Sequence, residues 1–347
     1  MIANRLYGIH DLRIEEMELP LLKDDEVLVK VKACGICGSD VNRYFTSGTY
    51  HYPTTIGHEF SGVVAEVNNE EDKNLIGKRV GIFPLIPCFE CEQCKKRNYE
   101  LCSSYDYLGS RSDGGFAEYV AVPKWNLITL PDNVSYEEGA MLEPASVALH
   151  VLKKIGSLEG KNVLITGPGP IGIILGNIAK IKGAGKVILV GRSEDKLKFA
   201  QQNGIENVLN SNDSGIDEKI KEITGGKGFE IALEGTGAES CLTFILDRIA
   251  AEGTVVVYGN PHGDINIKKD SYWKILRKQL TIKGTWNSSF GGEENEWKEI
   301  LNLLESGKLH LSPLITHRFP LEGLKEGLEK MNDKNCFTCK VMITDEL

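Results

Sequence analysis

Four cysteines lie within fifteen residues, in the pattern Cys88-x2-Cys91-x2-Cys94-x7-Cys102. Thiolates at this spacing can bind one tetrahedral metal ion, so we predict a closed, structural zinc site. The segment PCFECEQCKKRNYELC is polar and charged, which is typical of an exposed lobe that needs a metal in place of a core. Disulfides are disfavoured because the N-terminal segment has no long apolar region of the kind that a secretory signal needs. An iron–sulfur cluster is disfavoured because the spacing from Cys94 to Cys102 differs from the spacings in ferredoxins.

A second set of metal-binding residue types is spread over three segments. Cys37 lies in CGICGSD, His58 and Glu59 lie in IGHEFSG, and Glu143 lies in AMLEPASVALH. One thiolate, one imidazole and one carboxylate would leave the fourth position of a zinc ion open, which is typical of a catalytic metal. We expect each residue to stand in a turn, since the segments are rich in Gly or flanked by Pro. Spacing does not distinguish Cys37 from Cys34, and such residues taken singly are usually structural.

A glycine-rich turn, GPGPIG, follows the apolar segment KNVLITG and precedes an apolar segment with helical periodicity. A strand, this turn and a helix together are the context of a dinucleotide-binding motif. Its N–H groups and helix dipole bind a pyrophosphate. We therefore predict five coenzyme-binding residues here: Gly167, Gly169, Pro170, Ile171 and Gly172.

The end of the next strand, Gly191-Arg192-Ser193, bears on which nucleotide fits. An Asp or Glu at this point would bind the ribose 2′-hydroxyl of NAD, whereas a guanidinium and a hydroxyl group suit a 2′-phosphate. Residue chemistry therefore favours NADP(H). In the alternative interpretation, Glu194 or Asp195 binds the ribose and Arg192 stacks on adenine or faces solvent.

The elements that position these residues change in character near residue 150. Before it, short β-rich segments such as EVLVKVKAC and FAEYVAVP are broken by Gly and Pro. From Lys161 onward strands alternate with helices, which predicts a doubly wound parallel sheet. We expect an α/β protein with three parts: a β-rich catalytic domain at 1–150 that contains the zinc lobe at 84–104, a coenzyme-binding domain at 151–285, and a return to the first domain at 286–347.

Composition restricts the partners. The 347 residues carry a net charge of −9 with a pI near 5.4, which disfavours nucleic acid and anionic membrane surfaces. No segment approaches the roughly 20 apolar residues of a membrane span. We expect a cytoplasmic protein, since nine cysteines, an odd number, fit a reducing compartment in which thiolates bind metals.

The order GICGSD, GHEFSG, the four-cysteine lobe, DGGFAEY, EP and GPGPIG resembles the zinc-containing medium-chain dehydrogenase/reductase superfamily over the whole chain. YHYPTTIGHEFSG, PLIPCFECEQC and SYDYLGSRSDGGFAEY are most similar to galactitol-1-phosphate 5-dehydrogenases, with sorbitol and other polyol dehydrogenases next. The resemblance implies a GroES-like catalytic domain, a Rossmann coenzyme domain, and a homodimer or homotetramer.

Carried over by motif, the resemblance implies that Cys37, His58 and Glu143 bind the catalytic zinc, with Glu59 supporting these ligands or exchanging with them. It assigns the structural zinc to Cys88, Cys91, Cys94 and Cys102. It also implies NAD(H), although Gly191-Arg192 replaces the acidic residue of NAD-dependent polyol enzymes. Asn42 stands where some relatives carry a proton-relay histidine.

The predicted chemistry follows from an open zinc ion. The metal would lower the pKa of a secondary alcohol, and the alcohol would give its hydride to a nicotinamide. Ser39 would accept a hydrogen bond from the alcohol and pass the proton toward solvent or the coenzyme ribose. Four residues are candidates for a substrate phosphate: Arg111, Tyr50, His51 and Asn287. Arg111 suits a bidentate phosphate contact, and the alternative is that it is an ordinary surface arginine without a ligand.

The predicted function is oxidation of a polyol phosphate to a keto-sugar phosphate. A dehydrogenase of unphosphorylated polyols is the alternative within the same class. A non-catalytic, nucleotide-binding redox sensor is the alternative from a different class, and the complete set of Cys37, His58 and Glu143 speaks against it.

Overall fold

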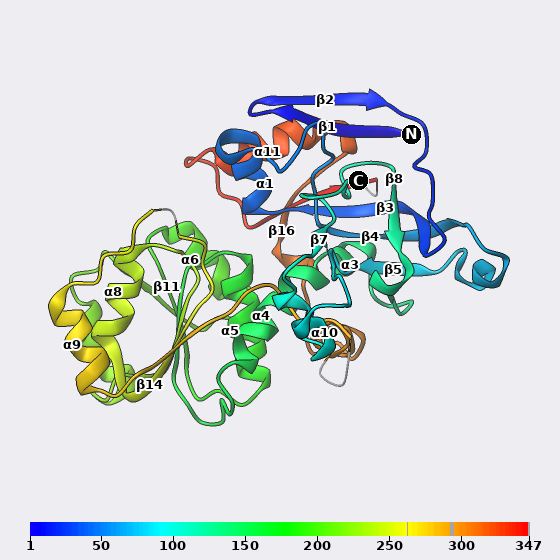
Figure 1. The fold of residues 1–347 in the computed structure, drawn as a ribbon. Helices are drawn as coiled ribbons and strands as arrows, with labels where there is room; N and C mark the ends of the chain where they lie inside the picture. Colours follow the sequence, from blue (N-terminus) through cyan, green and yellow to red (C-terminus); the bar gives the residue numbers. More distant parts are fainter. Residues whose placement is uncertain (262, 292–294, 346–347) are drawn as a thin grey trace. The chain divides into compact units, whose positions relative to one another are not determined.

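A computed structural model describes residues 1–261, 263–291 and 295–345 and divides the chain into two units (Figure 1). One unit comprises Met1–Ser146 and Ser288–Leu347, and the other comprises Val147–Asn287. The sequence predicts divisions near residues 150 and 285, and the structure divides the chain after Ser146 and after Asn287. We call these the catalytic unit and the coenzyme unit.

The catalytic unit is built on a mixed seven-stranded sheet in the order β16-β17-β3-β4-β5-β9, with β8 pairing β3. The strands are β3 (Glu26–Ile36), β4 (Glu59–Val67), β5 (Arg79–Ile82), β8 (Tyr119–Pro123), β9 (Leu127–Thr129), β16 (Ile315–Phe319) and β17 (Lys340–Thr344). Two small sheets pair β1 (Ile2–Gly8) with β2 (Asp11–Glu16) and β6 (Leu85–Ile86) with β7 (Asp106–Tyr107). The helices are α1 (Gly38–Asn42), α2 (Glu92–Lys95), α3 (Tyr136–Ala140), α10 (Glu296–Glu305) and α11 (Leu324–Asn332).

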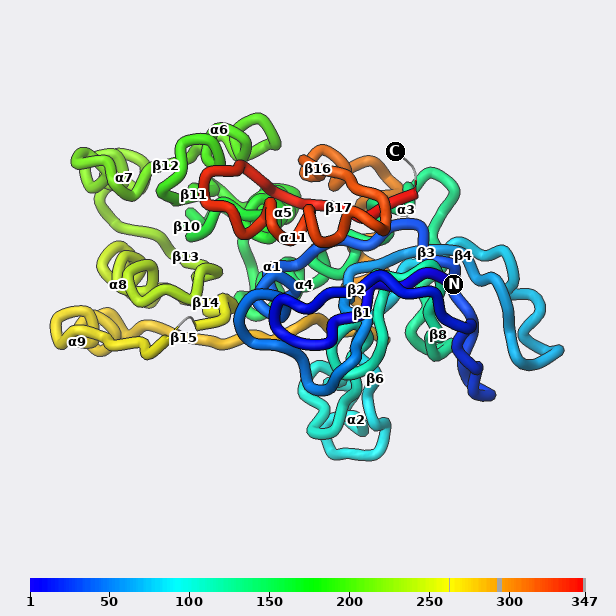
Figure 2. Tube along the Cα trace, turned by 90° about the horizontal axis from the view of Figure 1, so that it is seen from above, coloured from blue at the N-terminus to red at the C-terminus, as the bar shows by residue number. Residues whose placement is uncertain are grey.

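Strand β3 organises this unit because the residues toward both of its ends are buried. It pairs antiparallel with β4, β8 and β17, and side chains such as Val29, Ile36 and Phe60 form the core beneath it. The pairing of Val341 with Ile36 brings the C-terminal strand β17 alongside β3 (Figure 2). Strand β17 therefore lies next to the segment CGICGSD, which contains Cys37.

The coenzyme unit contains a six-stranded parallel sheet in the order β12-β11-β10-β13-β14-β15, with helices on both sides of it (Figure 1). The strands are β10 (Val163–Thr166), β11 (Val187–Gly191), β12 (Asn207–Asn210), β13 (Phe229–Glu234), β14 (Ile249–Val257) and β15 (Thr281–Gly284). The helices are α5 (Pro170–Ile181), α6 (Glu194–Gln202), α7 (Ile216–Thr224), α8 (Glu239–Arg248) and α9 (Lys269–Arg277), and α4 (Leu142–Lys153) runs into this unit from the catalytic unit. The predicted doubly wound parallel sheet is confirmed.

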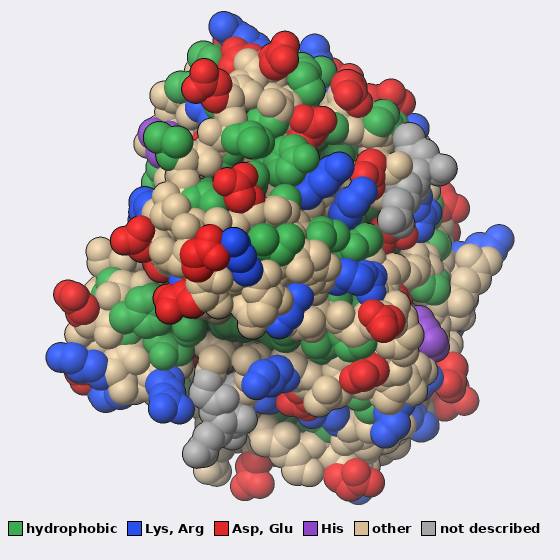
Figure 3. All heavy atoms as spheres, turned by 90° about the vertical axis from the view of Figure 1, so that its right-hand side faces the viewer, with side chains coloured by type: hydrophobic (Ala, Val, Ile, Leu, Met, Phe, Trp, Pro, Cys, Tyr) green, Lys and Arg blue, Asp and Glu red, His purple; other side chains and the backbone are tan. Residues whose placement is uncertain are grey.

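The surface carries mixed charge. Figure 3 shows acidic and basic side chains interspersed over one face of the molecule. Within the described ranges, no helix is both long enough and apolar enough to span a bilayer.

Candidate active site and structural metal site

The four predicted lobe cysteines converge. Their Sγ atoms all lie within 4.8 Å of one another, and the measured separations are 3.5 Å for Cys88–Cys102, 3.9 Å for Cys88–Cys94 and 4.0 Å for Cys91–Cys102. Zn–S bonds of about 2.3 Å in a tetrahedron give S–S edges of about 3.8 Å. The donor set therefore fits zinc. All nine cysteines, each within the described residues, are free thiols rather than disulfides.

Local backbone geometry prepares two of these thiols, Cys88 and Cys91, for a metal. The N–H groups of Cys94 and Ser103 point at the sulfur of Cys91 and lower its pKa to about 5, which favours the thiolate. The N–H of Cys91 donates in the same way to the sulfur of Cys88 at 3.4 Å and contributes to lowering its pKa. The lobe lies between β6 and β7, so their pairing closes it at its base.

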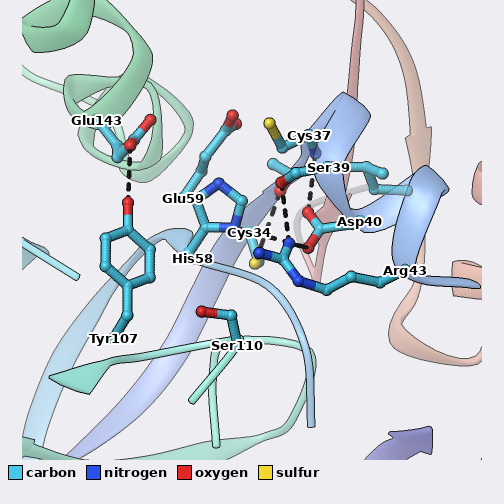
Figure 4. A network of polar contacts seen from close by, with 12 residues as sticks. Cys34, Cys37, Ser39, Asp40, Arg43, His58, Glu59, Tyr107, Ser110 and Glu143 are labelled. Carbon is cyan, nitrogen blue, oxygen red and sulfur yellow. Dashed lines mark hydrogen bonds and ion pairs between the residues drawn. The ribbon is translucent and has the colours of Figure 1, made fainter. Parts of the chain in front are cut away.

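A second cluster forms in the catalytic unit from Cys37, His58 and Glu59, whose donor atoms lie within 4.8 Å of one another (Figure 4). Cys37 precedes α1 as its N-cap, and Glu59 begins β4 directly after His58. Because β4 pairs with β3, with Glu59 opposite Gly35, residues far apart in the sequence meet at one end of the sheet. A thiolate, an imidazole and a carboxylate suit zinc.

Glu143, predicted from the resemblance as a ligand, is not part of this cluster. Its Oε1 instead accepts a hydrogen bond from the Tyr107 hydroxyl at 3.2 Å, and burial raises the pKa of Glu143 to about 7. The predicted turn at this point is wrong, since Glu143 is the second residue of α4. Pro144 is compatible with a helix here because the first turn leaves its N–H groups unpaired in any case.

Asp40 is a functional residue that the sequence reasoning missed. Its fully buried carboxylate accepts from the Cys37 N–H at 3.0 Å and lies 3.6 Å from His58 Nδ1 and 3.2 Å from Arg43. Burial alone would raise the pKa of Asp40, but His58 and Arg43 favour the carboxylate and lower it. An acidic residue three positions after a turn cysteine is a capping-box pattern, which was a signal available in the sequence.

Asp40 in turn acts on His58. Burial lowers the pKa of a histidine, but the carboxylate of Asp40 outweighs this effect, and the pKa of His58 is raised well above its usual range. A metal ion requires the neutral imidazole, so zinc binding at this site displaces a proton. The carboxylate of Asp40 lies 3.6 Å from Nδ1 of the ring.

Lys340 is the second residue that was missed. Its Nζ donates to Glu59 Oε2 at 2.5 Å, and the two side chains are 4% and 2% exposed. Burial would lower the pKa of Lys340, but Glu59 more than offsets this and raises it to about 12. The two residues are 281 positions apart, so no local pattern could have paired them.

Ser39, the predicted proton acceptor, lies beside the cluster (Figure 4). Arg43 Nη1 donates to Ser39 Oγ at 2.9 Å. The hydroxyl oxygen retains a second lone pair, and its own O–H can donate onward.

The substrate candidates have different surroundings. The Arg111 guanidinium is sandwiched between the rings of Tyr50 and Tyr105, 4.5 Å and 4.4 Å from their centroids. His51 Nε2 is 2.8 Å from the Arg111 carbonyl oxygen, and Tyr50 is 68% exposed. Three of the four candidates thus meet in one place, whereas Asn287 is the last residue of the coenzyme unit.

The glycine-rich turn has the geometry of a pyrophosphate site. Gly167 adopts a φ of +99°, which disfavours other residues, and α5 begins at Pro170 with Gly169 as its N-cap. A Cβ at Gly172 would lie 2.1 Å from the Gly167 carbonyl oxygen, so only glycine allows the helix to approach the turn. A Cβ at Gly169 would meet nothing within 4 Å, which leaves its backbone accessible to a ligand.

Comparison with known proteins agrees with this geometry. Residues 23–132 match the family described as the alcohol dehydrogenase GroES-like domain, and residues 170–306 match the family described as zinc-binding dehydrogenase. Galactitol 1-phosphate 5-dehydrogenase from Escherichia coli K12 is 35% identical over 344 residues, which cover 99% of each chain. The chain belongs to the zinc-binding dehydrogenase family.

The structure of galactitol-1-phosphate dehydrogenase from Escherichia coli superposes on this dehydrogenase with a TM-score of 0.92 and 34% identity over 99% of this chain and 100% of the other. The predicted combination of a GroES-like domain and a Rossmann domain is confirmed, as is the superfamily. The protein is a zinc-dependent, NAD(P)-linked alcohol dehydrogenase.

Two further structures contain a coenzyme. A zinc-binding dehydrogenase from Sinorhizobium meliloti 1021 bound to NADP has a TM-score of 0.90 and 27% identity, covering 99% of this chain and 98% of the other. An alcohol dehydrogenase from Escherichia coli CFT073 complexed with NADH has a TM-score of 0.90 and 28% identity, covering 99% of each chain. The family fold accommodates either coenzyme.

The residues predicted to distinguish NADP from NAD lie between the end of β11 and the start of α6. Arg192 is exposed, and Ser193 caps α6 by accepting from the Lys196 N–H. The Glu194 carboxylate accepts a hydrogen bond from the Asn210 amide, so it is already engaged within the protein. A Cβ at Gly191 would lie 2.5 Å from Pro168 Cγ in the glycine-rich turn.

Proposed function

We propose that this dehydrogenase oxidises a secondary hydroxyl of a phosphorylated hexitol, of the galactitol-1-phosphate type, to a keto-sugar phosphate. The observation that carries the proposal is the caged guanidinium of Arg111. Stacking on two tyrosine rings holds the planar group in place, and the described residues offer it no carboxylate partner. Its Nη1 donates to the Tyr105 carbonyl oxygen at 3.5 Å, and the remaining N–H groups suit a phosphate.

The position of Arg111 relative to the metal cluster supports the same substrate. The Arg111 N–H donates to the Tyr107 carbonyl at 2.9 Å, and the Tyr107 ring lies 5.8 Å from the His58 ring. A short tight turn therefore connects Arg111 to Tyr107, whose ring lies beside the proposed metal ligand His58. The similarity to galactitol 1-phosphate 5-dehydrogenase is a second, independent support.

We assign Cys37, His58 and Glu59 as the residues that hold the catalytic zinc. When bound there, zinc supplies Lewis-acid chemistry that lowers the pKa of the substrate hydroxyl. Ser39, with its oxygen oriented by Arg43, accepts a hydrogen bond from the substrate hydroxyl and relays the proton, passing its own O–H proton to solvent or to the coenzyme ribose. A nicotinamide coenzyme held by the glycine-rich turn would supply the hydride acceptor.

The test compares galactitol 1-phosphate with galactitol and sorbitol in wild type and Arg111→Ala. Loss of a charge-assisted contact worth about 1.5–3 kcal/mol should raise KM for the phosphate ester roughly tenfold to a hundredfold and leave the free polyols nearly unchanged. Arg13→Ala is the matched control, because Arg13 also stacks on a tyrosine ring, at 4.3 Å from the Tyr7 centroid. Equal losses on esters and free polyols would favour an unphosphorylated polyol as the substrate.

For the coenzyme, we propose NADP(H). Arg192 is exposed, no carboxylate occupies position 191, and Glu194 is engaged by Asn210. These three features favour a 2′-phosphate over a ribose 2′-hydroxyl.

We also propose that two copies of the chain pair along β15. This edge strand of the parallel sheet exposes all four of its residues, and the neighbouring helix α9 exposes Tyr272, Trp273 and Leu276, which are 53%, 45% and 52% exposed. An unpaired edge strand beside an apolar surface is typical of a strand that pairs with a second chain.

A further inference from the structure

Tyr107 lies beside the metal cluster but has no role in the proposed reaction. Its ring centroid is 5.8 Å from that of His58, with the planes inclined by 58°, and its hydroxyl donates to Glu143 Oε1 at 3.2 Å. Figure 4 shows the phenol reaching toward Glu143, on the side of His58 away from Cys37 and Asp40. The tyrosine is therefore placed to act on the Glu143 carboxylate and not on that of Asp40.

The backbone fixes this position firmly. Tyr107 is the last residue of β7 and pairs with Leu85 of β6, at the base of the four-cysteine lobe. The next residue, Leu108, donates its N–H to the Pro84 carbonyl at 2.9 Å, and the Tyr107 carbonyl accepts from Arg111 at 2.9 Å. Closure of the lobe thus holds the phenol in place.

Two glutamate carboxylates are candidates for one metal ion, in addition to the Asp40 carboxylate that is paired with His58 and Arg43. Glu59 lies inside the cluster with Cys37 and His58, whereas Glu143 is buried nearby and lies outside it. If both carboxylates bound the metal, four protein ligands would close the site, as they do in a structural zinc site. The reaction requires the fourth position for the substrate, so Glu143 has to be kept away.

We propose that Tyr107 is a positioning residue whose hydroxyl holds the Glu143 carboxylate off the metal and keeps the fourth coordination position open. The inference rests on the proposed ligand set of Cys37, His58 and Glu59. Tyr107 acts through Glu143 by the hydrogen bond that its hydroxyl donates to Oε1 at 3.2 Å.

The test removes one oxygen atom. In Tyr107→Phe, the released Glu143 should become a fourth ligand, so the catalytic zinc should leave for a chelator about tenfold more slowly than in wild type. Imidazole, a probe of the open position, should bind about tenfold more weakly to the cobalt-substituted enzyme in a visible-absorption titration. Turnover should fall, while the KM for the coenzyme should stay the same.

A second variant separates positioning from packing. In Tyr107→Phe/Glu143→Ala the competing carboxylate is gone, so imidazole affinity and the rate of zinc loss should return toward the wild-type values. A packing defect at Tyr107 would not be repaired in this way. Tyr119→Phe, on β8 in the same unit, removes the same atom elsewhere and should change neither quantity.

Two results would overturn the proposal, and they are distinguishable. Zinc loss and imidazole binding in Tyr107→Phe that match those of Tyr119→Phe would show that Tyr107 does not control Glu143, and would leave the ligand set intact. Loss of the catalytic zinc from Glu143→Gln by itself would show instead that Glu143 is a ligand, and would contradict the ligand set on which the proposal rests.

Discussion

Two of the carboxylates at the candidate metal cluster, Asp40 and Glu59, each have an opposite charge beside them. Asp40 lies between His58 and Arg43, and Glu59 is bonded to Lys340. A buried charge without a partner is costly, so these pairs allow the carboxylates to remain ionised in a buried site. These ion pairs are formed by the protein's own side chains, and a bound cation would add further positive charge beside the carboxylates.

The ligand assignment gives a prediction for single residues. Cys37→Ser and His58→Ala should each reduce kcat below about a tenth of wild type, because metal assistance contributes several kcal/mol to such a reaction. Coenzyme binding, measured by fluorescence titration, should be unchanged, since the coenzyme unit has its own core. Near-normal turnover in either variant would mean that other residues hold the catalytic metal.

At the scale of elements, two short turns determine the coenzyme site. The glycine-rich turn after β10 and the end of β11 are in contact, because Gly191 leaves room for Pro168. A carboxylate introduced at position 191 would bring a Cβ into that contact. Gly191→Asp would therefore disturb the turn as well as the charge, and it is a poor test of coenzyme choice by itself.

Arg192→Ala is the cleaner variant. We expect the ratio of kcat/KM for NADP to that for NAD to fall roughly tenfold to a hundredfold, the effect of losing a charge-assisted hydrogen bond. Lys196→Ala, one turn into α6, serves as a control for loss of positive charge. A wild-type enzyme that already prefers NAD clearly would contradict the proposal and would favour Glu194 or Asp195 as the ribose ligand.

The two metal sites should differ in lability because their elements differ. Four thiolates close the lobe between β6 and β7, whereas the cluster beside β4 offers three ligands and an exchangeable position. Metal analysis should find two zinc ions per chain, and mild chelation should remove one of them together with the activity. A single zinc that is lost only on unfolding would contradict the two-site interpretation.

At the scale of the whole molecule, the exposed edge strand predicts the oligomeric state. Ile282→Lys should convert the dimer to a monomer in light scattering, because the charge would lie in the paired edge. Ile14→Lys is the matched control, since Ile14 is similarly exposed, at 50% against 42%, but lies on β2. A dimer that withstands the change at Ile282 would place the interface elsewhere.

The sequence by itself determined what depends on short-range spacing. The lobe cysteines converge because fifteen residues can bring four sulfur atoms together, and the strand, glycine-rich turn and helix follow from local periodicity and from the φ of Gly167. Only the tertiary structure decided how distant segments meet. It paired Lys340 with Glu59, placed Glu143 beside Tyr107 and packed Pro168 on Gly191. These contacts depend on strand register and on side-chain volume, which act between residues far apart in the sequence and leave no local pattern there.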